Sequence, residues 1–379
     1  MSNTRPQNYF ENLDATRFLG FFHVFLAHCF FTTNSDIASS SAYRIATVNI
    51  RSGFLGLDYF FVLSSFLLTW LALAEWKKTG TFHPGLFMVR RGLRLWPLYF
   101  SLILGTYGLV ALLGEQLGIS TLPPISVFLL FVSNFWIAFQ GQDFLFLLVF
   151  FWSIAVEEQF YLVWAMVLRY LHRYLVPVSL VMIAVSVWYR ATHLEQEAQL
   201  YFHTLSYLGN FGIGALTAHL AFNKPAFLER VKTMPRWFIV LTYLALAILT
   251  AGYFRWFQTP FMVIIEKLVF GFFFAFLILE QCYAEHSFFK LGRLKRIGYL
   301  GQLSLGLYCF HGVVLTFALP YLKAQGWADQ AWQVFFLNPL LIFLATLVLA
   351  QLSHSLIEAP IHRLRKHFYP KTSSSTSGV

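Results

Sequence analysis

The sequence predicts an all-α polytopic membrane protein. Of its 379 residues, 58% are hydrophobic and only 12% are charged, whereas an ordinary soluble domain has about 25% charged residues. The apolar runs are about 20 residues or longer and mostly do not alternate with polar residues, which excludes a β-barrel. Helices are then the remaining way to cross a lipid bilayer, because they satisfy their own backbone hydrogen bonds.

The apolar runs predict about ten transmembrane helices and one shorter segment. We expect the spans at residues 11–32, 54–75, 95–114, 145–170, 175–192, 199–222, 237–254, 261–281, 298–320 and 332–357. The apolar run 126–139, of about 14 residues, is too short to span and predicts a re-entrant or interfacial segment.

The distribution of Lys and Arg predicts that both termini are cytoplasmic. With ten spans, the basic clusters at 90–94, 224–236, 290–296 and 362–366 all fall on one side, which the positive-inside rule assigns to the cytoplasm. An additional span at 126–139 would turn the later clusters outward. The same pattern accounts for the formal net charge of +10 without nucleic acid as a partner.

The chain divides into three parts. We expect a polar N-terminal leader at residues 1–10, one membrane domain at 11–362, and a cytoplasmic tail at 363–379 that is first basic and then disordered. A cleavable signal peptide is not expected, because the first apolar run is too long. The three cysteines lie inside apolar runs and have neither disulfide nor metal spacing.

The first predicted span carries four ionisable side chains, Asp14, Arg17, His23 and His28. Such groups are costly in a bilayer unless they are paired or hydrated, so they indicate function. At about 100° per residue, Asp14, Arg17 and His28 share one stripe of the helix, while His23 points the other way. Arg17 and His28 are then about 16 Å apart along the axis, one near the membrane edge and one well inside.

Asp58 lies in the outer third of the second span, upstream of Ser64 and Ser65. Small residues permit close packing of membrane helices, which is sufficient to explain the serines. An unpaired carboxylate at this depth is costly, so Asp58 indicates a functional partner.

Three arginines, Arg90, Arg91 and Arg94, lie within five residues before the third span. Arg90 and Arg94 are four residues apart and can point together, and Pro97 suits the first turn of the following helix. The positive-inside rule alone accounts for basic residues here. Arginine in place of lysine is also what bidentate phosphate binding uses, so both interpretations stay open.

Two adjacent carboxylates, Glu157 and Glu158, interrupt the apolar run 145–170. They are about 100° apart on a helix, so at least one must face a hydrated cavity, another helix or an arginine. In the run 298–320, Ser304, Tyr308 and His311 share one helix face and predict either a site lining or a helix–helix hydrogen bond. Pro360, two residues after Glu358, is explained by termination of the last span.

These stretches form a linked set of motifs in order along residues 11–362. The set comprises Asp14-x-x-Arg17 with His28, the run Gly53 to Ser64, Arg90-Arg91-x-x-Arg94-x-x-Pro97, Trp152-Ser153 through Tyr161, Ser304-x-x-x-Tyr308-x-x-His311, and Glu358-x-Pro360. It resembles the acyltransferase-3 family of integral membrane acyltransferases. Ser65, Phe151 and Leu305 depart from the family pattern, and none of these departures removes an ionisable group.

The resemblance implies that the protein transfers an acyl group, usually acetyl from cytoplasmic acetyl-CoA, to a hydroxyl of a carbohydrate or another extracytoplasmic or lipid-linked acceptor. It also implies a bacterial inner membrane. Hydroxyl attack on a thioester needs a base that neutral imidazole supplies, so we expect His28 to be the general base or an acyl-carrying nucleophile. Glu157 or Glu158 would orient His28 or hold Arg17, and Asp58 would line the acceptor side.

The same resemblance implies which residues bind the donor, which others line the site, and which co-substrate the protein uses. Arg17, Arg90, Arg91 and Arg94 would bind the donor's phosphates, and further lining residues would be Asp14, Trp152, Ser153, Tyr161, Ser304, Tyr308 and His311. We expect no metal and no permanently bound cofactor, with acyl-CoA as co-substrate. The alternative is a proton-coupled transporter or flippase of a glycan or small metabolite, which predicts internal repeats or paired broken helices.

Overall fold

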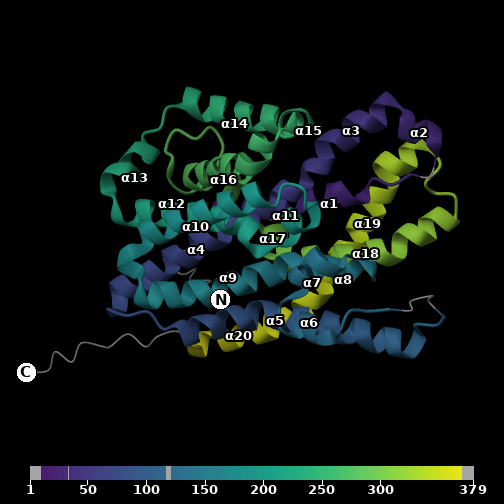
Figure 1. Ribbon diagram of the computed structural model, residues 1–379, viewed down its shortest axis with the longest axis horizontal. Helices are drawn as coiled ribbons and strands as arrows, with labels where there is room; N and C mark the ends of the chain where they lie inside the picture. Colours follow the sequence, from purple (N-terminus) through teal and green to yellow (C-terminus); the bar gives the residue numbers. More distant parts are fainter. Residues whose placement is uncertain (1–9, 33, 117–120, 369–379) are drawn as a thin grey trace, which may run out of the picture.

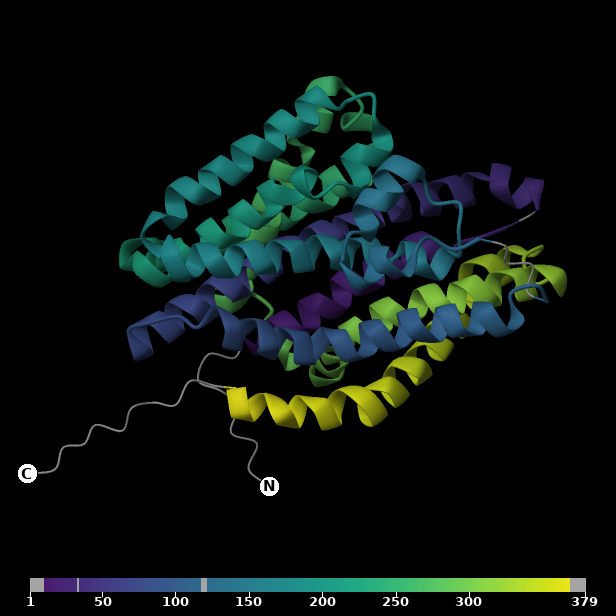
Figure 2. The same cartoon turned by 60° about the horizontal axis from the view of Figure 1, so that its bottom comes forward.

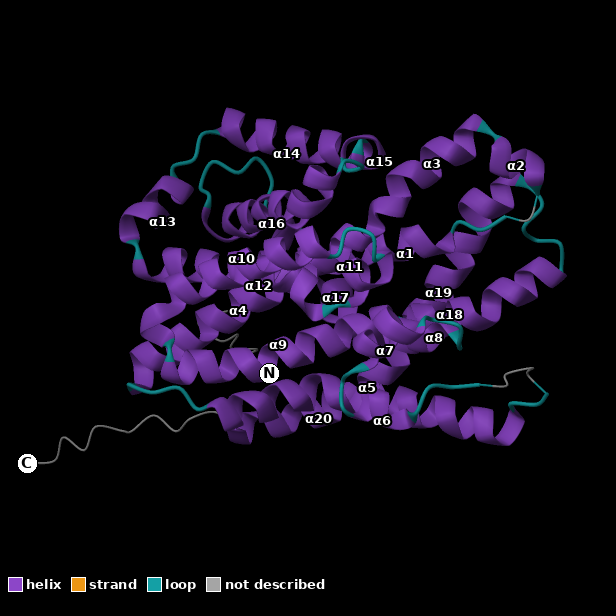
Figure 3. Ribbon diagram, viewed as in Figure 1, coloured by secondary structure: helices purple, strands orange, loops and turns teal. Residues whose placement is uncertain are grey.

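The computed structural model describes residues 10–32, 34–116 and 121–368, and this part of the chain consists of helices joined by short loops, without a strand (Figure 1, Figure 3). The all-α class that the composition predicts is therefore confirmed. Residues 1–9 and 369–379 of the predicted leader and tail lie outside the described residues, whereas residues 363–368 continue as helix.

The first half of the chain contains α1 to α9. Their bounds are α1 Glu11–Cys29, α2 Ser35–Ser39, α3 Ser41–Arg51, η1 Ser52–Phe54, α4 Leu55–Thr79, α5 Pro84–Leu113, α6 Ile125–Leu129, α7 Ser133–Gln140, α8 Phe146–Val149 and α9 Phe151–Tyr170. The segment 126–139 forms α6 and α7, two short helices that are not long enough to cross a membrane.

The second half continues to α20. Its bounds are η2 His172–Tyr174, α10 Leu175–Thr192, α11 Glu197–Phe202, α12 Thr204–Asn223, α13 Pro225–Lys232, α14 Arg236–Ala251, α15 Tyr253–Trp256, α16 Pro260–Tyr283, η3 Leu291–Arg293, α17 Lys295–Gln302, α18 Ser304–Ala324, η4 Gln333–Leu337, α19 Asn338–Ser353, η5 His354–Glu358, α20 Ala359–Leu364 and η6 Arg365–Phe368. Two of these elements, η4 and η5, are π-helical turns at either end of α19.

Seven helical stretches of the described chain are long and apolar enough to cross a membrane, and an eighth is added if α13 and α14, bent by 85°, form one span. The sequence predicts ten. The other two expected spans, 11–32 and 199–222, form α1 and α12, which are 19 and 20 residues long. Their mean hydropathy is lowered by the ionisable stripe of α1 and by the glycine, asparagine and histidine residues of α12.

The arginine segment before the third span is helical, which differs from the expected cytoplasmic loop. α5 begins at Pro84, whose missing N–H costs nothing in the first turn of a helix. Pro97, expected in the first turn, therefore lies inside α5, where it removes one backbone hydrogen bond. All three arginines therefore belong to the same helix as the third span.

Several expected spans are interrupted. The run 145–170 is divided between α8 and α9 at Phe150, the run 199–222 at His203, and the run 298–320 at Leu303. A break leaves backbone groups without a partner in their own helix, and these groups must find one elsewhere. The break at Phe150 contributes to the candidate site described below.

Most long helices run along the long axis of the molecule (Figure 1). α14 lies along one edge and α5 with α20 along the opposite edge, with α4, α9 and α12 between them. Figure 2 shows α10 to α16 as a group on one side, and α19 and α20 on the other. The end of α4, the beginning of α5 and α20 lie together at the left-hand end in Figure 1, whereas α2 and α3 lie at the right-hand end.

Glycines allow the central helices to approach one another closely. A Cβ atom at Gly214 of α12 would collide with the backbone oxygen of Val62 in α4, and one at Gly301 of α17 would collide with that of Asp14 in α1. Small residues at such contacts permit close packing of membrane helices. The contact at Gly301 holds the polar first half of α1 against α17.

Candidate active site

A cavity lies between α1, α4, α5, α9 and α18, and three guanidinium groups line it: Arg17, Arg91 and Arg94. The other polar lining residues are Ser64, Ser153, Glu157, Ser304 and Tyr308. Apolar walls are supplied mainly by α4, through Leu57, Phe60, Phe61, Leu63 and Leu67. Three cations face one carboxylate, so the cavity is suited to an anionic ligand with an apolar part.

A hydrogen-bonded chain connects Arg91 to the opposite wall. The Arg91 guanidinium donates to the Tyr161 hydroxyl and lies 4.2 Å from the centre of its ring. Tyr161 donates to Glu157 Oε2 at 2.8 Å, and Ser64 donates to Glu157 Oε1 at 2.8 Å. This chain joins α5, α9 and α4, so the side chains that line the cavity are held in place by one another.

Arg90 does not belong to the cavity lining. It donates to Glu75 Oε2 at 2.9 Å and to the backbone oxygen of Phe368 at 2.8 Å. The structure therefore directs Arg91 and Arg94 to the same cavity, whereas the expected pair was Arg90 and Arg94. Glu75, at the end of α4, explains why Arg90 points away.

Asp14 and Glu158 also lie behind the cavity wall. Asp14 accepts from Arg17 at 2.6 Å and from Gln302 at 3.3 Å, so it holds the arginine that faces the cavity. Glu158 accepts from Trp96 Nε1 at 3.0 Å, while its neighbour Glu157 faces the cavity. The two carboxylates thus point in different directions, as helix geometry requires.

His28 lies further along α1, outside the cavity lining. Its Nδ1 is 2.8 Å from the backbone oxygen of Val24, and its ring is 5.0 Å from that of Phe150 and 5.8 Å from that of His311, between ring centres. Glu157 and Glu158 contact other residues, so what orients His28 is the Val24 carbonyl and the packing of Phe150. His23 points to the other side of α1, where its Nε2 lies 3.4 Å from Ser52 Oγ.

The face of α18 predicted to carry Ser304, Tyr308 and His311 connects the cavity with His28. Ser304 and Tyr308 line the cavity, and His311 is completely buried one turn further along. The Tyr308 hydroxyl lies 2.6 Å from Ser153 Oγ and donates to the backbone oxygen of Phe150 at 3.1 Å. Phe150 caps the start of α9, so Tyr308 ties α18 to the junction between α8 and α9.

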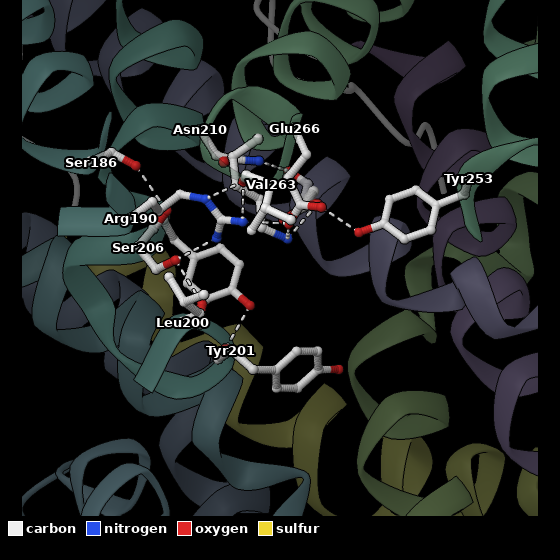
Figure 4. Close-up of polar contacts among 12 residues, drawn as sticks. Ser186, Arg190, Leu200, Tyr201, Ser206, Asn210, Tyr253, Val263 and Glu266 are labelled. Carbon is white, nitrogen blue, oxygen red and sulfur yellow. Dashed lines mark hydrogen bonds and ion pairs between the residues drawn. The ribbon is translucent and has the colours of Figure 1, made fainter. Parts of the chain in front are cut away.

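Asp58 belongs to a second polar group, the buried ion-pair cluster of Asp58, Arg190, Glu266 and Lys267. Lys267 Nζ is 3.0 Å from Asp58 and 3.6 Å from Glu266. Arg190 is 2.7 Å from Glu266, which also accepts from Tyr253 (Figure 4). Asp58 is about 100° around α4 from Leu57, which faces the cavity, so it points toward α16.

Three members of this cluster, Arg190, Glu266 and Lys267, are not among the candidate residues predicted from the sequence. Glu266 and Lys267 are adjacent charges inside the apolar run 261–281, the same signal that identified Glu157 and Glu158. Arg190 lies near the end of the expected span 175–192, and only 2% of its surface is exposed. Trp152 likewise lies outside the cavity lining, where its ring packs 5.2 Å from those of Tyr201 and Phe202, between centres.

No group of three or more His, Cys, Asp or Glu side chains that could hold a metal ion is found in the described part of the chain. The fold and the cavity together define a class: a polytopic helical membrane protein with a cationic, hydroxyl-lined cavity beside a pair of histidines. A family model described as an acyltransferase domain matches residues 10–354, and the chain belongs to this acyltransferase-3 family. Membership classes it with enzymes that transfer acyl groups other than aminoacyl groups.

Three curated relatives of the chain come from bacteria. The O-acetyltransferase OatA of Staphylococcus aureus (strain NCTC 8325 / PS 47) is 26% identical over 346 residues, which cover 85% of this chain and 54% of the relative. The peptidoglycan O-acetyltransferase OatA of Listeria monocytogenes is 25% identical over 340 residues, 85% of this chain and 53% of the relative. The putative peptidoglycan O-acetyltransferase YrhL of Bacillus subtilis is 26% identical over 328 residues, 82% and 51%.

The chain spans about half the length of these relatives. No solved structure matches it.

Proposed function

We propose that this protein transfers an acyl group, acetyl in the first instance, from acetyl-CoA to a hydroxyl of a carbohydrate acceptor in the bacterial cell envelope. The single observation that carries the proposal is the cavity in which Arg17, Arg91 and Arg94 converge. Acyl-CoA combines several phosphates with a slender uncharged arm that ends in a thioester. The names of the relatives, O-acetyltransferase and peptidoglycan O-acetyltransferase, favour acetyl as the group and a glycan as the acceptor.

The donor binds with its phosphates against the three cavity arginines. Arginine presents a planar fork that matches phosphate oxygens in pairs, and two of these guanidiniums are already held from behind, Arg17 by Asp14 and Arg91 by Tyr161. Arg90 is engaged by Glu75 and the Phe368 carbonyl, and plays no part in donor binding.

His28 is the general base for the acceptor hydroxyl. A backbone carbonyl can only accept, so the contact with Val24 puts the ring proton on Nδ1 and leaves Nε2 to take the hydroxyl proton. Ser153 and Tyr308 lie at the cavity wall, where rotation of either hydroxyl away from the Phe150 carbonyl would give a donor to the oxyanion that forms on the thioester carbonyl. The alternative role for His28, an acyl-carrying nucleophile, differs by a covalent acyl-enzyme.

The topology that goes with this function has ten crossings, both termini in the cytoplasm, and the bacterial inner membrane as its location. α1 and α12 then cross among the more apolar helices, where burial against α4, α17 and α10 shields their polar residues. Arg91 and Arg94 belong to the first half of α5, and the beginning of α5 lies with the end of α4 and with α20 at one end of the molecule, which supports entry of a cytoplasmic donor at that end (Figure 1).

The test uses the full chain in nanodiscs with radiolabelled acetyl-CoA and peptidoglycan-derived oligosaccharides. We expect release of free CoA together with label in the oligosaccharide as an alkali-labile ester. His28→Ala should abolish ester formation, while His23→Ala, on the opposite side of the same helix, should retain it. Intact mass after incubation without acceptor separates the two roles of His28, because only an acyl-enzyme adds the mass of the acyl group.

Two results would contradict the proposal. If the wild-type chain neither binds nor cleaves acetyl-CoA, the cavity does not bind an acyl donor. A transporter or flippase is then the favoured function. If His28→Ala folds normally and transfers acetyl at the wild-type rate, another group is the base.

A further inference from the structure

His28 and His311 form a pair of imidazoles at the contact of α1 and α18. Their ring centres are 5.8 Å apart, and the Phe150 ring lies against both, at 5.0 Å from His28 and 4.4 Å from His311. His28 is half-buried, whereas His311 is completely buried behind it. The pair therefore has one member near the surface and one deep inside the protein.

The hydrogen bonds of the two rings assign the same tautomer to both. His28 Nδ1 contacts the Val24 carbonyl, and His311 Nδ1 contacts the Tyr308 carbonyl. Since carbonyls only accept, both Nδ1 atoms carry the proton and both Nε2 atoms are acceptors. His311 Nε2 is buried and has no hydrogen-bond partner among the described residues. A buried acceptor without a partner is costly, and the Nε2–H of a protonated His28 turned toward it would supply the missing donor.

The position of His311 relates it to both reaction partners. Its ring centre lies 5.3 Å from that of Tyr308, which lines the donor cavity, and on its other side it faces His28. In acyl transfer the proton leaves the acceptor hydroxyl, while the negative charge of the leaving group develops on the donor sulfur. A route for the proton from His28 toward the cavity exists through His311, which has His28 on one side and the cavity-lining Tyr308 on the other.

We propose that His311 is a proton-relay residue that receives the acceptor's proton from His28 and returns it to the donor side. The hydroxyl oxygen forms the C–O bond to the acyl carbon, and its proton moves to His28 Nε2. The C–S bond breaks and its electron pair stays on sulfur. The proton then passes from His28 to His311 Nε2 and on to the thiolate, so ester and free CoA form without a net gain or loss of protons. This inference rests on the proposed function.

The test compares His311→Asn with the wild type in the nanodisc assay, with acetyl-CoA as donor and peptidoglycan-derived oligosaccharide as acceptor. Asparagine keeps an N–H donor for the Tyr308 carbonyl but lacks the atom that accepts the proton. We expect kcat to fall about 100-fold, as general acid–base groups contribute about 10² to 10⁴. The KM and Kd for acetyl-CoA should stay within about twofold, since the arginines are untouched.

A single-turnover measurement separates relay from structure. His28 begins each experiment neutral, so the first acyl transfer in His311→Asn should proceed within about threefold of the wild-type rate even though kcat falls. A structural role would instead slow the first turnover as well and lower the melting temperature. His23→Gln is the matched control and should leave all of these quantities unchanged.

The outcomes distinguish this inference from the proposed function. If the wild type transfers acetyl and His311→Asn, folded and binding acetyl-CoA, keeps its kcat, the relay is wrong while the acyltransferase stands. The relay is also overturned if kcat and the first turnover fall together. If the wild type itself shows no transfer or CoA release, both fail. His311→Gln, which places an amide near the Nε2 position but no nitrogen basic enough to take up a proton, should remain as slow as His311→Asn.

Discussion

Two neighbouring arginines of α5 have different surroundings, although both belong to the same sequence motif. Arg94 lines the cavity, whereas Arg90 is bound by Glu75 and the Phe368 carbonyl. Because a charge-assisted hydrogen bond contributes about 1.5–3 kcal/mol, we expect Arg94→Ala to raise the KM for acetyl-CoA about 10-fold to 100-fold. Arg90→Ala should leave KM within about twofold and lower the melting temperature instead. Steady-state kinetics with thermal melts of both variants provide the measurement.

Arg94→Lys serves as the control for charge alone. A lysine ammonium keeps the charge but not the fork that matches phosphate oxygens, so an intermediate KM is expected. If Arg94→Ala leaves the KM as unchanged as Arg90→Ala does, Arg94 does not bind the donor and the arginines serve topology only.

The role of Asp58 also depends on its contacts with single side chains. It pairs with Lys267 in a cluster of two acids and two bases, and removing one member of a buried pair costs about 3–5 kcal/mol. Asp58→Asn should therefore lower the melting temperature strongly. The double variant Asp58→Asn/Lys267→Met removes one charge of each sign, so it should recover most of the stability and, with it, the activity.

The double variant also tests the hypothesis that Asp58 lines the acceptor side of the site. If the double variant is as stable as the wild type but inactive, Asp58 has a role in the reaction that pairing does not explain. Recovery of activity would assign Asp58 to holding α4 against α16.

The contact of α17 with α1 positions Arg17, which lines the cavity. A Cβ atom at Gly301 would collide with the backbone oxygen of Asp14, which holds Arg17. Gly301→Ala should separate the two helices, lower the melting temperature and raise the KM for acetyl-CoA, because Arg17 moves with α1. Gly298→Ala is the matched control on the same helix, since a Cβ atom there has open space around it.

Both variants gain the same helix propensity, because alanine is about 1 kcal/mol more favourable than glycine in a helix interior. Gly298→Ala should therefore be neutral or slightly stabilising. If Gly301→Ala behaves in the same way, α17 does not press on α1 and the position of Arg17 has another cause.

The orientation of the protein in the membrane can be measured by labelling single cysteines in two of its loops. After replacement of the free cysteines Cys29, Cys282 and Cys309, single cysteines are placed at His83, between α4 and α5, and at Glu195, between α10 and α11. Ten crossings with cytoplasmic termini put His83 inside and Glu195 outside. A membrane-impermeant maleimide should label Glu195→Cys in intact cells, but His83→Cys only after lysis.

Labelling of both positions from the same side would exclude the ten-span arrangement. If His83→Cys is labelled in intact cells and Glu195→Cys only after lysis, the arginines face outward, away from cytoplasmic acyl-CoA. This result would contradict both the donor site and the topology.

Much of this architecture follows from the chain before any packing is known. A bilayer penalises ionisable groups, so Asp14, Arg17, His28, Glu157 and His311 are conspicuous in the sequence alone. Helix periodicity then assigns them to faces, as it does for His23 on the far side of α1 and for the shared face of Tyr308 and His311. These properties depend only on a residue's neighbours within its own helix, and therefore can be predicted from order along the chain.

What depends on a second helix was decided by packing. Arg94 shares the cavity with Arg91 and not with Arg90, because Glu75 at the end of α4 draws Arg90 away. Asp58 faces Lys267 of α16, more than 200 positions later in the chain. The junction at Phe150 brings its carbonyl to the Tyr308 hydroxyl and its ring against both histidines. Periodicity determines the direction of a side chain on its own helix, but the partner in that direction exists only once the helices have packed together.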